Sequence, residues 1–404
     1  MNDWHTYNNN KPTSLYTRFL KQKLNRKFLK MILYGSLFFL AMFLLISKFI
    51  AKNDQDLDVK SSDVALNYEF NPKLPYDNSK FKYYNSVYPL SLPVVNKKHG
   101  TITYKLLAIA DLDTNSKLIK SDTKYSSYLL KGSLTLSEDH KRAEIEFESN
   151  AKEINSQYSY GDRGMELSDL VVFNGKLYSC DDRTGIVYEI NLNTNQAVPW
   201  VILPDGDGNA GKGFKCEWMT VKDKHLYVGG LGKEWTTTKG VLVNDYPQWI
   251  KIVGPLGDVT HANWSSNYNK IRTKLGYSFP GYMIFESCCW DDINEKWYWL
   301  PRRASNESYD EVLDEKRATN LLIWADEPIN AINALRIGNI IPTRGYSSFK
   351  FVPNTNNQLI IALKSEENES RTRSFVNLFD IYGNVLLDDI LLSDHLKYEG
   401  IEFI

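Results

Sequence analysis

The chain has 404 residues, 43% of them hydrophobic, which is enough to bury a large core. Its 48 basic and 49 acidic side chains leave a net charge of −1, which excludes a whole-chain electrostatic attraction to nucleic acid. The 25 Tyr and 10 Trp residues favour a strand-rich protein.

The N-terminal region predicts a membrane anchor. Residues 1–30 carry seven Lys or Arg and the single acid Asp3, so we expect a basic cytoplasmic tail. Met31 to Ile50 then supplies about twenty apolar residues in which only Lys48 is charged, a length that spans a bilayer. Because the basic residues precede the span, the rest of the chain is expected in the endoplasmic reticulum or Golgi lumen, or at the cell surface. The protein would then be a single-pass type II membrane protein.

A polar, proline-bearing stretch over residues 51–98 predicts a stem. Cleavage there would release the following domain, and the sequence leaves this open. Three acceptor sequences for N-glycosylation begin at Asn263, Asn306 and Asn368, as in a lumenal glycoprotein. The four cysteines show no CxxC spacing, and the sequence does not decide whether any of them pair.

A propeller domain is predicted over residues 99–404. His99 to Asp113 reads as a strand that ends in two carboxylates, Asp111 and Asp113. The C-terminal stretch KYEGIEF reads as another strand. A closed ring leaves no open sheet edge when one blade is built from both ends of the chain, so we expect these two strands to share a blade.

Between these strands a short hairpin pattern recurs. It first appears in ELSDLVVFNGKLYSCDDRTG, where Asn174-Gly175 is a strong two-residue turn signal. Similar patterns follow at Lys215, Phe285 and Tyr346, and the C-terminus supplies the fifth copy. Repeats of this size with several short strands predict a five-bladed β-propeller. The repeated position is occupied by Ser168, Glu217, Glu286, Ser348 and Glu399.

These five oxygen-bearing side chains are expected to converge on a central channel. Three are carboxylates, which cannot all stay ionised in a confined space unless a cation compensates them. The set contains no His and no thiolate, so it suits calcium or magnesium rather than zinc. Calcium is favoured because it accepts six to eight oxygens in loose geometry.

The longer motifs resemble a known family. GMELSDLVVFNGKLYSCDDRTG, KGFKCEW, VGGLGKEWTTT, PGYMIFES, WLPRRAS, SSFKFVPNT, IIALKSEE and KYEGIEFI are similar to the soluble calcium-activated nucleotidase (apyrase) family. The resemblance covers roughly residues 99–404. It implies a five-bladed propeller that hydrolyses nucleoside di- and triphosphates, such as UDP, GDP and ADP, with calcium in the channel.

Site roles follow from the repeats and the resemblance together. The expected calcium ligands, through side-chain or main-chain oxygens, are Ser168, Asp169, Glu217, Glu286, Ser348 and Glu399. The resemblance implicates Asp111 and Asp182 in catalysis, and either could handle the attacking water. Cations at strand ends could hold phosphates, and Trp218 or Trp235 could stack on a base. The expected substrate-binding residues are Asp113, Arg183, Lys215, Trp218, Lys233, Trp235, Arg302, Arg303 and Lys364.

Two other classes of protein remain open at this point. One is a non-catalytic propeller that is stabilised by calcium and binds a protein partner. The other is a calcium propeller hydrolase acting on lactones or phosphotriesters, which would not need cations around the ring. The sequence does not reveal the nucleotide preference or whether the protein forms a homodimer.

Overall fold

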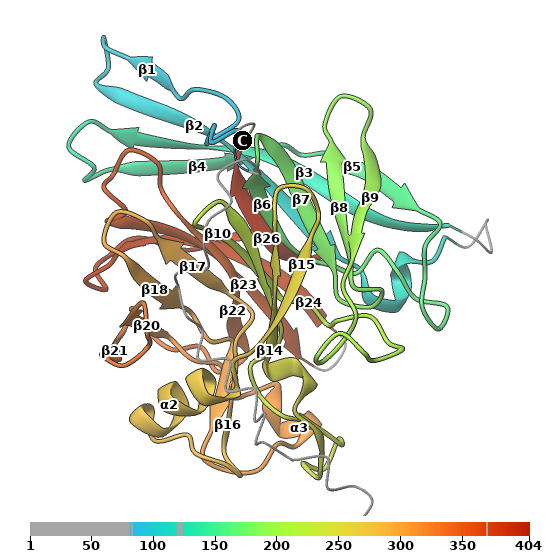
Figure 1. Ribbon diagram of the computed structural model, residues 1–404. Helices are drawn as coiled ribbons and strands as arrows, with labels where there is room; N and C mark the ends of the chain where they lie inside the picture. Colours follow the sequence, from blue (N-terminus) through green and yellow to red (C-terminus); the bar gives the residue numbers. More distant parts are fainter. Residues whose placement is uncertain (1–80, 82–83, 119–123, 369–370) are drawn as a thin grey trace, which may run out of the picture. The chain divides into compact units, whose positions relative to one another are not determined.

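The computed structural model describes residues 81, 84–118, 124–368 and 371–404, and these form an all-β ring (Figure 1). Five antiparallel sheets are the blades of a five-bladed propeller, as the repeats predict. In the described part of the chain, no helix is both long and apolar enough to cross a membrane. The predicted anchor, Met31 to Ile50, lies outside the described residues.

Four blades are built from strands in chain order, with the first strand innermost. One contains β6 (Leu167–Phe173), β7 (Lys176–Asp181), β8 (Ile186–Asn191) and β9 (Gln196–Ile202). The next contains β10 (Trp218–Lys222), β11 (His225–Gly229), β14 (Trp249–Val253) and β15 (Val259–Asn263). A third contains β17 (Cys288–Asp291), β18 (Lys296–Trp299), β20 (Leu321–Asp326) and β21 (Asn333–Arg336). A fourth contains β22 (Arg344–Phe351), β23 (Leu359–Asn368), β24 (Arg371–Asp380) and β25 (Val385–Ser393).

The remaining blade is assembled from both ends of the propeller sequence. Its innermost strand, β26 (Lys397–Phe403), pairs with β2 (Thr101–Asp111), so that Leu106 lies opposite Phe403. Outward from β2 follow β3 (Tyr125–Ser137), β4 (Ala143–Phe147) and β5 (Lys152–Ser156), while β1 (Val94–Asn96) pairs with β2 on its other edge. The predicted closure of the ring is confirmed. It joins the last inner strand of the chain to the blade built from the first strands, so that the ring has no open gap.

The inner strands touch in a closed order, β26–β6–β10–β17–β22 and back to β26. Successive side chains on each strand point to opposite faces, so each inner strand contributes to two apolar interfaces. Trp218 packs between the β10 and β17 blades, whereas its neighbour Met219 packs between the β6 and β10 blades. Each of the five gaps between blades is filled in this way, and burial of these side chains holds the ring together.

Two close approaches require glycine. Asn174-Gly175 forms the predicted turn between β6 and β7, with φ of 50° and 72°. Gly400 in β26 lies against β6, where an added Cβ would stand 2.7 Å from the backbone of Asp169 and Leu170. The absence of a side chain therefore lets two inner strands approach each other.

Additional elements decorate one end of the ring. They are β12 (Trp235–Thr236), β13 (Leu242–Asn244), β16 (Tyr282–Ile284), β19 (Arg303–Ser305) and the helices α2 (Ser265–Leu275) and α3 (Glu311–Asp314). Short 3-10 helices cover Asp113–Ser116 and Tyr246–Gln248. Figure 1 shows α2 and α3 at the end opposite the C-terminus.

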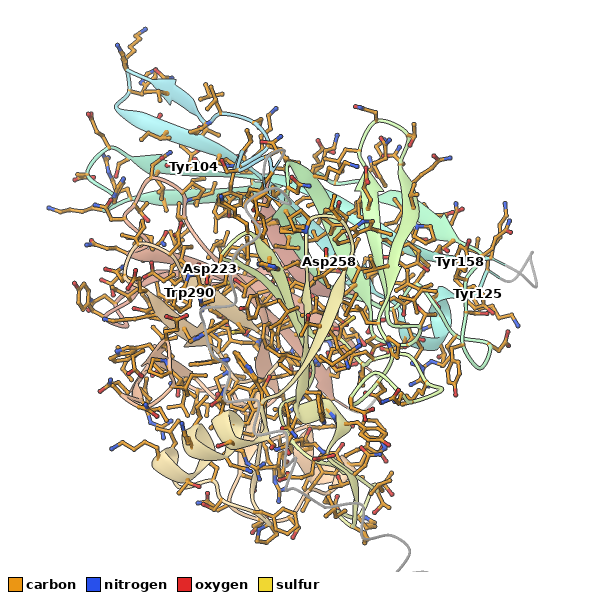
Figure 2. The ribbon with its side chains drawn as sticks, in the orientation of Figure 1. Tyr104, Tyr125, Tyr158, Asp223, Asp258 and Trp290 are labelled. Atoms are coloured by element: carbon orange, nitrogen blue, oxygen red, sulfur yellow. The ribbon has the colours of Figure 1, made fainter. Side chains whose placement is uncertain are left out.

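Polar contacts add to the apolar core at the opposite end. Figure 2 labels Asp223 and Trp290, which meet around Lys222 of β10. The Lys222 ammonium pairs with Asp223 and lies 4.6 Å from the centre of the Trp290 ring, on the neighbouring blade. The four cysteines are buried free thiols, which settles the question left open by the sequence.

Candidate active site

The inner strands begin together at the end of the ring that carries α2 and α3, which we call the mouth (Figure 1). In β6, β22 and β26 the pairing register shifts close to this end. The shifts fall beside Ser168, between Tyr346 and Ser348, and at Glu399. Such β-bulges interrupt the regular pleat. Three of the five repeated polar positions therefore lie at or beside irregular points of otherwise apolar strands.

Arg302 joins acids from three blades at the mouth. Its Nη1 contacts Glu286 and lies 2.9 Å from Glu399 Oε1, while its Nη2 contacts Glu367. The Arg302 side chain is 7% exposed, so these contacts are made away from bulk water. The guanidinium group therefore brings the predicted ligands Glu286 and Glu399 together in the channel.

Lys397 forms a second junction, two residues before Glu399 on β26. Its Nζ lies 2.8 Å from Asp111 Oδ2 and 2.7 Å from Asp113 Oδ2. It also lies 3.6 Å from carboxylate oxygens of Glu367 and Glu399. The predicted catalytic residue Asp111 thus faces the same space as the predicted metal ligand Glu399.

Lys215 and Arg163 complete the set of cations. Lys215 contacts Asp182 and lies 2.8 Å from Glu217 Oε1. Arg163 contacts Glu166 and lies 3.6 Å from Asp113 Oδ1. Lys215 thus links the β10 blade to the β6 blade through Asp182, and Arg163 links the β6 blade to the closing blade through Asp113.

In this network eight carboxylates contact four cations among the described residues, so acid is in excess. The carboxylates are Asp111, Asp113, Glu166, Asp182, Glu217, Glu286, Glu367 and Glu399, and the cations are Arg163, Lys215, Arg302 and Lys397. Excess buried carboxylate favours either proton uptake or the binding of a cation.

The pKa shifts reflect this excess. Burial raises the pKa of Glu217 to about 8, despite the attraction of Lys215. Burial also raises the pKa of Asp111 to about 6, with Lys397 opposing, and that of Glu166 to about 7. These carboxylates would regain their charge most easily beside a positive ion.

Asp182 behaves differently. Burial opposes its ionisation, but Lys215, Lys397 and Arg183 together outweigh burial and hold the pKa of Asp182 below its usual range. Its Oδ1 atom is buried without a hydrogen-bond partner. Asp182 is therefore an ionised carboxylate with one acceptor oxygen free.

The donor set fits calcium. The Oγ atom of Ser168 is buried without a partner, and Glu217 Oε1 approaches Lys215 without hydrogen-bond geometry. Oxygens of Asp111, Asp113 and Glu166 lie within 4.8 Å of one another. These donors are all oxygens from the mouth, as a hard cation such as calcium prefers.

Asp169 and Ser348, also predicted as ligands, use their side chains elsewhere. The Asp169 carboxylate lies 3.2 Å from Lys350 Nζ and accepts hydrogen bonds from Ser348 Oγ at 2.9 Å and Met219 N at 2.8 Å. Ser348 Oγ also accepts a bond from Ile401 N at 3.3 Å. Because these contacts tie inner strands together, the two side chains act as parts of the fold and are not in the acidic network of the mouth.

The predicted substrate-binding residues fall into two groups. Asp113, Lys215 and Arg302 belong to the network at the mouth. Arg183 follows Asp182 and its buried Nε has no hydrogen-bond partner. Trp235 is partly exposed, with Lys212 Nζ 4.9 Å from the centre of its ring. These five positions are compatible with a bound nucleotide.

The structure places the other four predicted substrate-binding residues away from the network of the mouth. Trp218 is fully buried between two blades, so its faces are not available to a base. Lys233 donates to Glu234 O and Thr236 Oγ1, and Arg303 pairs with Asp314. Lys364 lies 2.8 Å from Asp389 Oδ1, on the outermost strand of its blade. Each of these three cations is held by a partner outside the network of the mouth.

Sequence reasoning missed Arg163, Glu166, Glu367 and Lys397 as members of the site. A signal for two of them was present. Glu166 precedes Ser168 and Lys397 precedes Glu399 by two residues, a spacing that places side chains on one face of a strand. The other two depend on loop and strand-end geometry that the repeats do not specify.

Together, the closed ring and the acidic, all-oxygen mouth define a five-bladed propeller with a candidate metal-dependent active site. A family model described as Apyrase matches residues 112–404. The chain is 51% identical over 325 residues to soluble calcium-activated nucleotidase 1 of Rattus norvegicus, covering 80% of this chain and 79% of that protein. It is 49% identical over 307 residues to apyrase apy-1 of Caenorhabditis elegans (75% and 85% covered), and 42% identical over 322 residues to an apyrase of Cimex lectularius (79% and 87% covered). The chain belongs to the apyrase family.

Proposed function

We propose that this protein hydrolyses nucleoside di- and triphosphates in a calcium-dependent reaction that releases phosphate. The proposal rests on one observation above all. The mouth combines an excess of buried carboxylates with the cations Lys215 and Arg302, so that it can bind a metal ion and an anionic phosphate chain in the same space. Membership of the apyrase family and the names of the relatives support it.

Oxygens of Ser168, Glu217, Glu286 and Glu399 would hold calcium, which would supply positive charge to neutralise and polarise the phosphate oxygens. Lys215 and Arg302 contribute positive charge to the same end of the substrate, and Arg302 can bridge two phosphate oxygens. Binding of a phosphate chain would draw these cations from their present carboxylate partners. The same carboxylates would then be available to the metal ion.

Asp182 orients the attacking water in this proposal. Its free Oδ1 can accept a hydrogen bond from water, and its depressed pKa keeps it ionised at neutral pH. The water oxygen forms a bond to the terminal phosphorus, and the bond from phosphorus to the bridging oxygen breaks. The water proton passes to the carboxylate, and the shortened nucleotide leaves with the bridging oxygen. Asp111, held by Lys397, is the alternative proton acceptor.

A nucleotide panel tests the proposal directly. Release of phosphate from UDP, GDP and ADP would be measured with calcium, with magnesium and with chelator. We expect turnover with calcium and little with magnesium, because loosely spaced oxygens suit the larger ion. Equal rates with both ions would remove the calcium assignment. Calcium-dependent stabilisation without any turnover would instead favour the non-catalytic scaffold.

We also propose that Met31 to Ile50 anchors the protein with its propeller in the secretory lumen or outside the cell. The order of the basic tail and the apolar run supports this orientation. Protease treatment of sealed vesicles is the test. The propeller should be protected, and its digestion without permeabilisation would reverse the topology.

A further inference from the structure

The chain segment that precedes the propeller, residues 84–92, lies across the end of the ring opposite the mouth. The Tyr84 ring packs against Phe173 at 5.7 Å between centroids, and the backbone N–H of Asn85 donates to Asn174 Oδ1 at 2.8 Å. Further along, Ser91 Oγ donates to the backbone oxygen of Ile404 at 2.7 Å. The contacted residues Phe173, Asn174 and Ile404 lie at or just beyond the ends of the inner strands β6 and β26. The segment is thus fixed at two points on this far end.

Tyr88, between these two points, reaches the inner strands of the ring. The residue is 46% exposed, and its hydroxyl donates to Glu402 Oε1 at 2.9 Å. Glu402 lies on the innermost strand β26 and is 2% exposed, and its other carboxylate oxygen bonds the backbone of β6, the neighbouring inner strand. The Tyr88 hydroxyl therefore contacts the inner wall of the ring.

A buried polar column continues inward from Tyr88. Glu402 Oε2 accepts a bond from Val172 N at 3.1 Å, and the backbone N–H of the preceding residue, Ile401, donates to Ser348 Oγ at 3.3 Å. Ser348 Oγ donates to Asp169 Oδ1 at 2.9 Å, and Asp169 also pairs with Lys350 at 3.2 Å. The segment that covers the far end therefore contacts a set of buried polar groups on the inner strands.

We propose that residues 84–92 are a stopper that closes the far end of the central channel, with Tyr88 as its plug, so that the active site is reached only through the mouth. Residues 84–92, which the sequence assigns to the stem, would then belong to the propeller and close one end of its channel. Substrate and both products must use the same opening. This inference does not depend on the identity of the substrate.

Cys289 provides a reporter for the test. It lies on the inner strand β17, and its Sγ donates to the backbone oxygen of Phe349, next to Lys350, at 3.0 Å. It is 5% exposed, so in the intact protein it should react slowly with a thiol reagent. The full-length protein and its Tyr88→Ala variant would be treated with N-ethylmaleimide under native conditions with calcium. Mass spectrometry would follow labelling at each cysteine. We expect Cys289 to react at least ~10-fold faster in Tyr88→Ala, while Cys180, Cys216 and Cys288 stay protected.

Three controls make the outcome decisive. Tyr88→Phe retains the ring and should label nearly as slowly as wild type, and Tyr382→Ala removes a 68% exposed tyrosine elsewhere and should change nothing. Labelling of all four cysteines would mean that the Tyr88→Ala variant is unfolded.

In that case the double variant Asn85→Ala, Ser91→Ala, which loosens the segment but keeps Tyr88, should raise Cys289 labelling alone. An unchanged Cys289 rate in a folded Tyr88→Ala, or in the double variant if Tyr88→Ala unfolds, overturns the proposal. Phosphate release, measured in parallel, tests the proposed function separately.

Discussion

Asp182 and Glu217 share Lys215 as a partner, yet they are expected to do different work. Asp182 stays ionised with a free oxygen, whereas burial holds Glu217 largely protonated near neutral pH until a cation compensates it. Replacing each carboxylate by its amide should therefore separate the two roles, because only one of the two replacements should affect calcium binding.

Replacing Asp182 by Asn keeps its size and polarity but removes the base. Turnover of a nucleoside diphosphate at saturating calcium should fall by roughly 10²- to 10⁴-fold. The increase in melting temperature caused by calcium should remain. Asp207→Asn, in an exposed loop, is the matched control and should retain full turnover. Near-normal turnover in Asp182→Asn would leave Asp111 as the acceptor.

Glu217→Gln should produce the opposite pattern. Calcium stabilises the protein because it binds only the folded state. Without the Glu217 carboxylate calcium should bind weakly, so the calcium-induced rise in melting temperature should largely disappear. The measurement is a calcium titration followed by thermal unfolding. A variant that keeps the wild-type calcium response would take Glu217 out of the metal site.

At the scale of elements, the inner strands determine both the packing of the ring and the site. Gly400→Ala would place a Cβ 2.7 Å from the backbone of β6, and backbone cannot move aside as a flexible side chain can. We expect a loss of about 1–3 kcal/mol in the free energy of unfolding. Gly211→Ala, where no atom lies within 4 Å of the added Cβ, should be nearly neutral. Equal stability of the two variants in denaturant titrations would show that β26 can shift away from β6.

The same elements explain what the sequence could predict. Strand alternation and the repeated turn signals follow from local chemistry, so the five blades, the closure by β26 and the acids Glu217, Glu286 and Glu399 were predictable. The partners of the Lys and Arg side chains were not predictable, because a Lys at a strand end can point toward the channel or away from it. Lys364 turns to Asp389 on an outer strand, and nothing in its local sequence distinguishes it from Lys215.

At the scale of the whole molecule, buried acids make stability depend on pH. Burial raises the pKa of Glu402 to about 7, even though Lys350 opposes the shift. A folded-state pKa above the unfolded one means that the folded protein holds its proton longer. Glu402 therefore costs nothing below about pH 4, and destabilises the fold progressively as the pH rises from about 4.5 to 7, by about 3 kcal/mol in total.

This contribution can be isolated by comparing wild type with Glu402→Gln. Denaturant unfolding between pH 5 and pH 8 should show a steeper loss of stability for wild type than for the variant. Other buried acids, such as Asp181, contribute equally to both proteins and cancel in the difference. Parallel pH profiles would mean that Glu402 is already ionised at pH 5.

The pairing of β2 with β26 also has a kinetic consequence. Leu106 and Phe403 are about 300 residues apart in the chain, and contacts between such distant residues form late because the intervening chain must first be brought to order. Lys397 and Glu399 enter the mouth only when β26 takes its place. A folding intermediate with four finished blades would therefore lack the metal ligand Glu399 and its neighbour Lys397 at the mouth. If the metal site is already formed in the transition state for closure, calcium should raise the folding rate. If the site forms only afterwards, calcium should lower the unfolding rate and leave the folding rate unchanged.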